Sequence, residues 1–574
     1  MAATGLLFVS NPRRIVASGL SVINQYVRNT LYIHFLPVTS HSPPSKQEDW
    51  KEKLGPRLPY LCRSIMNLYS KVSSCCPHLD ACVLLEPIKH NHVRNIQTLR
   101  EVDVVIFDSG FKSDDIDGFI KSRVSNLSGQ YKVILMPDSS PPIDLSEEMT
   151  EAEESPSSGP RSFDSVQDNV VLGGTFDRLH NGHKILLSEA IIRCSQKLTV
   201  GVTDTSMVKN KLLCELIQPC EQRIKSVREF VQDMDSSIVY DIVPIDDPFG
   251  PTKSDPSMQK LSQGTSQWYC KFDVNYLCMR TLQLIVVSGE TYKGALKVND
   301  LRKERGLPQL HIHEIPILAN ECKETTEEED KMSSSALRMH LLGTTLKIPE
   351  KVPKHPLLVG VEKVPYIIGL AGGIASGKSS VANRLEKLGA GIINCDILGH
   401  QAYEKGQPCY DDLIKAFGSD IIGLDGQVNR QILGKIVFSD QEKLELLNSI
   451  VWPHILELVR KTISEMVCQG KNIVVIEAAV LLRANWHVHC NEVWGCIITQ
   501  NEAIRRLQER TKLDVDECEK RILAQTPNSE VVAIANVVIS TLWSPEYTQK
   551  QVERAWKELQ CRVKDWLTLN PCQP

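Results

Sequence analysis

Apolar runs alternate with polar and glycine-rich turns along most of the chain, and this pattern predicts several α/β domains. Short β-rich runs at 81–85, 102–107 and 131–135 predict a small α/β region near the N-terminus. Two later apolar strands, at 169–172 and 366–370, each lead through glycines into an amphipathic helix. Because ligands bind at the carboxyl ends of strands in parallel sheets, the pattern predicts two separate nucleotide sites.

Polar segments interrupt this pattern twice. Residues 137–168 are rich in Ser, Pro, Glu and Asp, which predicts a flexible acidic linker that cannot bury a core. A second break, LKIPEKVPKHP, lies within the predicted linker 346–361. The expected division is an N-terminal segment 1–47, an α/β region of unknown role 48–136, the linker 137–168, a first nucleotide domain 169–345, the linker 346–361 and a second nucleotide domain 362–565.

Composition narrows the range of partners. The chain of 574 residues has a net charge of −5, whereas bulk binding of nucleic acid requires an excess of Lys and Arg, so we expect no nucleic-acid partner. The 18 cysteines include no paired CxxC clusters, and we expect reduced thiols. The longest apolar run, at 473–482, is too short to cross a bilayer.

The first 47 residues contain no Asp or Glu, while Arg13, Arg14 and Arg28 interrupt apolar stretches. This composition is typical of a mitochondrial presequence or a membrane-surface anchor, and the start of a folded domain at 15–36 explains it equally well. We therefore expect the chain at mitochondria, in the matrix or on the outer membrane, in the cytoplasm, or in both. Peripheral membrane association would use this N-terminus, and signalling partners would bind the N-terminal region and the acidic linker.

The first glycine turn reads GGTFDRLHNGH, from Gly173 to His183. It places two imidazoles at the N-terminus of a helix, where free N–H groups favour phosphate. Gly182 allows close approach of a triphosphate, and His180 and His183 can donate hydrogen bonds to oxygens that gain charge. Helix capping is the alternative role for the two histidines. The turn resembles the HxGH motif of the nucleotidyltransferase superfamily, which implies that His183 is catalytic.

Later segments extend this resemblance. KMSSSALR, from Lys331 to Arg338, resembles the superfamily's ISSTxIR signature, although a serine before a helix is by itself usually an N-cap. VSGET, at 287–291, resembles the eukaryotic-type phosphopantetheine adenylyltransferases, which implies substrate contacts from Glu290 and Thr291. The family also supplies a lysine, and the choice between Lys209 and Lys211 stays open. The expected ATP contacts of this site are Gly173, Thr175, His180, Gly182, His183, Lys209, Lys211, Ser333, Ser334, Ser335 and Arg338.

The resemblance implies a reaction without a covalent intermediate. The phosphate of 4'-phosphopantetheine is itself the nucleophile. The protein must align it with the α-phosphate of ATP and neutralise the pyrophosphate leaving group with Mg²⁺ and basic residues.

The second glycine turn fits the phosphate-binding pattern GxxxxGK[ST]. Its N–H groups cradle phosphates, Lys378 bridges the β- and γ-phosphates, and Ser379 ligates Mg²⁺. Asp396 ends the next strand and can accept the proton of an acceptor hydroxyl, or else caps the following helix. The expected ATP contacts in the turn are Gly372, Gly373, Ile374, Ala375, Ser376, Gly377, Lys378, Ser379 and Ser380.

Residues 366–540 resemble dephospho-CoA kinase, through this turn, NRQILGKIVFSD at 429–440 and RILAQ at 521–525. The resemblance implies that Asp396 is the base and Lys378 is catalytic. This sequence departs from the family at Trp452, where His is usual, and at Asn536, where an acidic residue is usual. The other residues that it implies are Arg430 and Glu477 for the coenzyme A substrate and Arg510 and Arg521 for a lid over ATP.

The order of the two halves resembles the bifunctional coenzyme A synthases, because the product of the first site is the substrate of the second. The sequence thus predicts the last two steps of coenzyme A synthesis on an α/β multidomain chain, with ATP, 4'-phosphopantetheine and dephospho-CoA as small-molecule substrates. The alternatives are a nicotinamide mononucleotide adenylyltransferase fused to a ribosylnicotinamide kinase, and a scaffold that only senses nucleotides. The kinase segments at 429–440 and 521–525 count against the first alternative.

Overall fold

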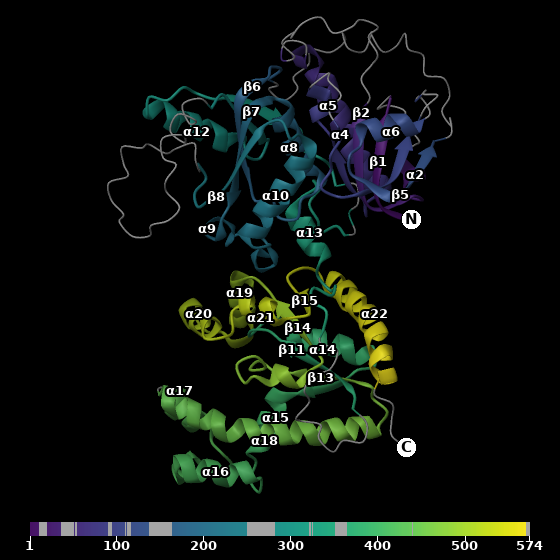
Figure 1. Ribbon diagram of the computed structural model, residues 1–574. Coiled ribbons are helices and arrows are strands. Elements are labelled where there is room, and N and C mark those ends of the chain that lie inside the picture. Colours follow the sequence, from purple (N-terminus) through teal and green to yellow (C-terminus); the bar gives the residue numbers. More distant parts are fainter. Residues whose placement is uncertain are drawn as a thin grey trace, which may run out of the picture. The chain divides into compact units, whose positions relative to one another are not determined.

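The chain forms two compact units, Met1–Leu337 and Arg338–Pro574 (Figure 1). The computed structural model describes residues 1–10, 20–35, 51, 54–89, 95–108, 111, 116–136, 163–249, 282–320, 323, 325–349, 364–438 and 440–569. Residues 137–162 of the predicted acidic linker 137–168 and residues 350–361 of the predicted linker 346–361 lie outside these residues.

The first unit begins with a five-stranded parallel sheet in the order β3-β2-β1-β4-β5. Its central strand is fully buried from Leu6 to Val9, as expected for a strand covered on both faces. The strands are β1 (Ala2–Val9), β2 (Val27–Phe35), β3 (Asp80–Val83), β4 (Val102–Phe107) and β5 (Leu127–Leu135). The helices are α2 (Leu20–Ile23), η2 (Gly55–Arg57), α4 (Leu58–Cys75), α5 (Glu86–Lys89) and α6 (Ile116–Arg123).

The α/β region therefore begins at residue 2 and not at residue 48. β1 and β2 both lie inside the segment 1–47 that the sequence analysis set apart. Acidic residues are absent from these strands because their side chains pack in the core, and the same absence is typical of a targeting peptide. Localisation itself stays a prediction.

A second parallel sheet of the same unit has the order β10-β9-β6-β7-β8. Its buried residues join those of the first sheet in one continuous hydrophobic core. The strands are β6 (Gln167–Gly174), β7 (Cys194–Thr203), β8 (Val239–Ile245), β9 (Leu284–Ser288) and β10 (His311–Ile315). The helices are α8 (Asn181–Ile192), α9 (Thr205–Val208), η3 (Cys214–Leu216), α10 (Cys220–Met234), α12 (Tyr292–Glu304) and α13 (Ser334–His340), the last of which reaches into the second unit.

The second unit is built on a parallel sheet in the order β12-β13-β11-β14-β15. The strands are β11 (Tyr366–Ala371), β12 (Gly391–Asn394), β13 (Ile473–Glu477), β14 (Glu492–Ile497) and β15 (Val537–Ser540). The helices are α14 (Lys378–Lys387), α15 (Cys395–Ala402), α16 (Pro408–Phe417), η7 (Ser419–Ile421), α17 (Arg430–Phe438), α18 (Gln441–Cys468), η8 (Trp486–His489), α19 (Gln500–Thr511), α20 (Val515–Leu523), α21 (Asn528–Ile534) and α22 (Pro545–Leu569).

The second unit starts earlier in the chain than residue 362. Gly343 N–H donates to the Val538 carbonyl at 2.9 Å, so the segment after α13 runs along β15. Thr345 donates its hydroxyl to the Glu558 carboxylate of α22 at 2.5 Å. Residues 338–347, which the sequence analysis divided between the first nucleotide domain and a linker, thus pack on the second unit.

The predicted α/β multidomain fold is confirmed by the three parallel sheets. Within the described residues, no helix combines the length and apolar character that a membrane span requires. The cysteines of the same residues are free thiols.

Candidate active sites

The GGTFDRLHNGH turn connects β6 to α8, and His180 is the N-cap residue of that helix. The rings of His180 and His183 stack with their centroids 3.9 Å apart. The Nδ1 atoms of both rings are buried without a hydrogen-bond partner among the described residues. Two polar ring atoms thus stand together at a helix N-terminus with bonding capacity left for a ligand.

Both histidines are neutral at pH 7. Burial lowers the pKa of His180 to about 4, and burial also holds the pKa of His183 well below its usual value. A positive charge on His180, when it is protonated, and the charge of Lys211 lower the pKa of His183 further. A neutral imidazole donates one N–H, so the histidines can orient phosphate oxygens, while positive charge must come from other residues.

Buried polar residues hold the turn from inside its own domain. Asp177 is fully buried and accepts a hydrogen bond from Gln218 N–H at 3.0 Å. Arg223 of α10, also buried, donates to the Thr175 carbonyl at 2.7 Å. The backbone of Phe176 and Arg178 has positive φ (51° and 49°), a strained conformation that costs about 1–3 kcal/mol per residue. Sequence reasoning missed Asp177 and Arg223, although both stand close to residues that it named.

The structure brings Lys211, and not Lys209, to this turn. The Lys211 ammonium donates to the hydroxyl of Thr175, which also accepts a hydrogen bond from Thr203 at 3.2 Å. Lys209 is the exposed C-cap residue of α9. Of the two lysines, Lys211 is therefore placed to add charge beside His183.

The KMSSS segment lies against the HNGH turn. A Cβ atom on Gly182 would stand 3.1 Å from the His180 ring and 3.9 Å from the Met332 carbonyl oxygen. The carboxylate of Glu290, in the turn after β9, pairs with the ammonium of Lys331. The three segments quoted for this site thus converge at the carboxyl ends of β6 and β9.

Some residues of these segments have local partners. Ser333 accepts a hydrogen bond from Ala336 N–H at 3.2 Å, which is N-capping geometry, and Ser334 and Ser335 open α13. Thr291 caps the turn before α12 by bonding to Ser288. Arg338 belongs to the second unit, where its side chain is buried. The predicted substrate and phosphate contacts of these residues stay predictions.

The second glycine turn connects β11 to α14. Gly372 and Gly377 have φ of 147° and 85°, and a Cβ on Gly372 would stand 2.4 Å from the Cys496 carbonyl oxygen. Glycine is therefore required at Gly372 by conformation and by space. Gly373, Ile374, Ala375 and Ser376 form the rest of the loop, in which Ala375 has φ of 60°.

Lys378 is folded back onto its own loop. Its ammonium donates to the carbonyl oxygens of Gly372 and Gly373 at 2.7 and 2.9 Å. Burial lowers the pKa of Lys378, although the nearby carboxylates of Asp396 and Glu477 oppose this effect. The loop thus holds a buried cation at the place where the sequence pattern predicts the β- and γ-phosphates.

Glu477, predicted to bind the coenzyme A substrate, lies beside the predicted metal ligand. Ser379 donates its hydroxyl to Glu477 Oε1 at 2.6 Å, and Asn394 donates to Glu477 Oε2 at 3.2 Å. A hydroxyl and a buried carboxylate are oxygen ligands of the kind that Mg²⁺ prefers. The residues present therefore fit a magnesium ion, and the predicted contact of Glu477 with coenzyme A stays a prediction.

Asp396 stands exposed in the first turn of α15, after the carboxyl end of β12. The same helix carries His400, whose Nδ1 lies 3.1 Å from the Tyr403 hydroxyl. The guanidinium of Arg430 stands 5.9 Å from the Tyr403 ring centroid, and its charge helps lower the pKa of His400, after burial. The predicted substrate-binding arginine and His400 thus both contact Tyr403, an aromatic residue that sequence reasoning missed, and Asp396 is close enough to His400 for its charge to oppose the lowered pKa.

The predicted lid arginines differ in their surroundings. Arg510 is close enough to Lys378 for its charge to lower the lysine's pKa. Arg521 is about half exposed and pairs with Glu517 of its own helix at 3.1 Å. Ser380, at the start of α14, bonds to Arg384 one turn later.

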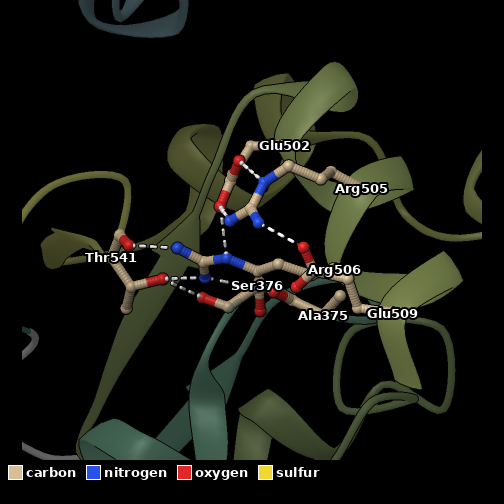
Figure 2. A network of polar contacts seen from close by, with 7 residues as sticks. All are labelled: Ala375, Ser376, Glu502, Arg505, Arg506, Glu509 and Thr541. Atoms are coloured by element: carbon tan, nitrogen blue, oxygen red, sulfur yellow. Dashed lines mark hydrogen bonds and ion pairs between the residues drawn. The ribbon is translucent and has the colours of Figure 1, made fainter.

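A third arginine, Arg506 of α19, makes the close contacts with the loop (Figure 2). It donates to the Thr541 hydroxyl at 2.8 Å and to the Thr541 carbonyl at 2.5 Å. Thr541 in turn donates to the Ser376 carbonyl at 3.0 Å, and Glu502 holds Arg506 from its other side at 2.7 Å. This network ties α19 and the end of β15 to the phosphate loop.

Comparison with known proteins matches both regions. Residues 366–542 match the family model of dephospho-CoA kinase, and residues 171–340 match the cytidylyltransferase-like family model. A dephospho-CoA kinase of Carboxydothermus hydrogenoformans is 40% identical over 203 residues, which cover 35% of this chain and 96% of that protein. A dephospho-CoA kinase of Moorella thermoacetica is 39% identical, covering 35% and 95%. A solved structure described as TT1252 from Thermus thermophilus is 30% identical, with a TM-score of 0.31, covering 35% and 98%.

Proposed function

The chain belongs to the dephospho-CoA kinase family, and on that premise we propose that it carries out the last two steps of coenzyme A synthesis. It is a kinase and a nucleotidyltransferase. The first unit transfers the adenylyl group of ATP to 4'-phosphopantetheine and releases pyrophosphate. The second unit then transfers the γ-phosphoryl group of a second ATP to the ribose 3'-hydroxyl of dephospho-CoA.

In the second unit, the phosphate loop binds ATP, and Lys378 exchanges the carbonyl oxygens of Gly372 and Gly373 for phosphate oxygens. Ser379 and Glu477 would hold Mg²⁺, which when bound neutralises charge on the β- and γ-phosphates. Asp396 accepts the proton of the 3'-hydroxyl as the phosphoryl group moves. Arg430 orients the substrate beside Tyr403.

In the first unit, the stacked neutral imidazoles of His180 and His183 donate to oxygens around the α-phosphate. Lys211 and Lys331 supply positive charge at the same strand ends. No side chain has to act as a nucleophile, because the substrate phosphate attacks directly. The protein's contribution is alignment and charge neutralisation.

One observation supports 4'-phosphopantetheine as the substrate of the first unit. The same chain contains both the HNGH turn and a dephospho-CoA kinase region. Only an adenylyl acceptor that ends in phosphopantetheine makes the product that the second unit phosphorylates. The resemblance of 287–291 to phosphopantetheine adenylyltransferases supports the same substrate.

Steady-state turnover tests the proposal. The purified full chain is supplied with ATP, Mg²⁺ and 4'-phosphopantetheine, and dephospho-CoA and then CoA should appear with one pyrophosphate released per adenylyl transfer. Parallel reactions contain nicotinamide mononucleotide and ribosylnicotinamide. Turnover of these compounds in place of phosphopantetheine would favour the rival fusion, and ATP binding without turnover would favour a nucleotide sensor.

A further inference from the structure

The two sheets of the first unit share one topology. When the strands of each sheet are numbered by their order along the chain, β3-β2-β1-β4-β5 and β8-β7-β6-β9-β10 both read 3-2-1-4-5, and all neighbours are parallel. The connecting helices also correspond, with α4 in the place of α10 and α6 in the place of α12. The N-terminal domain, described from residue 1 to residue 136 with gaps, thus repeats the strand order of the nucleotidyltransferase domain, an order that is common among doubly wound α/β domains.

The sequence after β1 differs from the HNGH turn. β1 continues into Ser10 and then Asn-Pro-Arg-Arg, with no glycine pair and no histidine before His34. At the carboxyl ends of β1 and β4, Asp108 accepts hydrogen bonds from Ser10 N–H and Oγ at 2.6 and 2.8 Å. Among the described residues, a carboxylate therefore stands at the strand end that corresponds to the phosphate turn.

The N-terminal domain instead bonds directly to the HNGH turn of its neighbour. Asn181, the residue between the catalytic-motif His180 and Gly182, donates its side-chain amide to the Ser73 hydroxyl at 2.7 Å and to the Tyr69 carbonyl at 3.0 Å. Both acceptors belong to α4, which packs along α8 (Figure 1). The side chain inside the motif is therefore fixed by a residue more than a hundred positions earlier in the chain.

Lys184, the residue after His183, is fixed by the same domain. Its buried ammonium donates to the Asp80 carboxylate at 2.5 Å and to the Ala81 carbonyl at 2.7 Å, at the start of β3. The two residues that flank Gly182-His183 thus each bond to the N-terminal domain. A shift of α4 would move Asn181, and a shift of β3 would move Lys184, so either one would displace the imidazole-bearing segment.

We propose that the N-terminal domain positions the HNGH turn, through Ser73 on Asn181 and Asp80 on Lys184. Asn181 and Lys184 act as positioning residues for His180 and His183. The inference rests on the proposed adenylyl transfer, because the imidazoles must meet the α-phosphate within a fraction of an ångström for full rate.

The test uses the full chain with the double substitution Ser73→Ala and Asp80→Ala, which removes both side-chain acceptors without touching the nucleotidyltransferase domain. The kcat of dephospho-CoA formation should fall on the order of tenfold to a hundredfold, with the KM for ATP changed less than about threefold. Asp80→Glu with Ser73→Thr, which restores both acceptors, should recover most of the rate. The kinase rate with added dephospho-CoA should be unchanged in the same preparation.

Tyr32→Phe is the matched control. It removes a hydrogen bond from the Tyr32 hydroxyl to Asp233, 2.7 Å in length, which joins the same two domains at the far end of α10. That end lies about 20 Å from the start of α10 at a rise of about 1.5 Å per residue. The control should leave the adenylyl-transfer kcat within about twofold of wild type.

Hydrogen exchange separates positioning from folding. The double variant should show faster amide exchange around 181–186 with little change in β6, β7 and β9. A wild-type kcat in the double variant, an equal loss in Tyr32→Phe, or faster exchange across the whole first unit would overturn the positioning role. Absence of dephospho-CoA formation in the wild-type chain would instead overturn the proposed function.

Discussion

The two phosphate turns of this chain are stabilised in different ways. The loop at Gly372–Ser379 is held within its own domain, because Lys378 bonds to loop carbonyls and Arg506 and Thr541 brace it from α19 and β15. The HNGH turn is held partly by its own Asp177 and Arg223, and partly by Ser73 and Asp80 of a different domain.

The difference follows from the chemistry of the phosphate-binding side chains, an ammonium in one turn and two imidazoles in the other. The lysine ammonium is a point charge on a flexible side chain, and carbonyl oxygens of its own loop can bind it. A neutral imidazole acts through the direction of its one N–H. The backbone that carries the two histidines must therefore be held in a fixed position. A domain that bonds both sides of the HNGH motif supplies that constraint.

The largest effect is expected for Lys378→Met. It removes the buried cation from the phosphate loop, and the kinase step should fall at least about a thousandfold. Adenylyl transfer should continue, so dephospho-CoA should accumulate when the chain is supplied with phosphopantetheine. Chromatographic separation of dephospho-CoA and CoA measures both outcomes, and unchanged CoA output would contradict the assigned role of the loop.

His183→Ala makes the reciprocal change in the other turn. Removal of one aligned donor should lower adenylyl transfer about a hundredfold to a thousandfold. The kinase rate with added dephospho-CoA should match wild type, which shows that the second unit is folded. Pyrophosphate release gives the rate, and a loss of less than about threefold would mean that His183 only packs in the first turn of α8.

Arg506→Met tests the hydrogen bonds that connect α19 to Thr541 and, through Thr541, to the phosphate loop. It breaks hydrogen bonds to Thr541 from a charged donor, worth about 1.5–3 kcal/mol, so the kinase kcat should fall about tenfold. Arg505→Met is the matched control, because Arg505 is on the same helix but pairs only with Glu502 and Glu509 in the network shown (Figure 2). Equal kinase rates for the two variants would show that the contacts between Arg506 and Thr541 are not needed for phosphoryl transfer.

The smallest effect concerns pH. Because burial lowers the pKa of His180 to about 4, the unfolded chain binds a proton on this residue between about pH 6.5 and pH 4 that the folded chain does not. The stabilising contribution of the neutral folded form is complete above pH 6.5 and is lost as the pH falls toward 4. Calorimetry of the first unit at pH 7 and pH 5 should show a smaller decrease in Tm for His180→Gln than for wild type.

Local patterns predicted much of this molecule. A glycine turn between an apolar strand and an amphipathic helix involves only neighbouring residues, so both phosphate turns and the α/β fold class could be identified before any contact was known. Lys211 could not be separated from Lys209 in the same way, because the choice depends on how the chain after α9 returns to Thr175.

Contacts between residues far apart in the chain could not be predicted from the sequence. Arg506 meets Thr541 and the Ala375 carbonyl, which lie 35 and 131 residues away, and nothing in the sequence around α19 marks it. The bond between Ser73 and Asn181 spans 108 residues. The pairing of Glu477 with Ser379 depended on β13 lying next to β11, which only the strand order reveals.

The place of β1 in its sheet has a consequence for handling the protein. Because this strand starts at Ala2 and lies between β2 and β4, proteolytic trimming after residue 35 would remove two adjacent strands and expose the apolar faces that they cover. A reporter fused to residues 1–47 alone would present those faces to chaperones and membranes, so its location in a cell would reflect exposed core as well as any address signal. Tags belong at the far end of the chain.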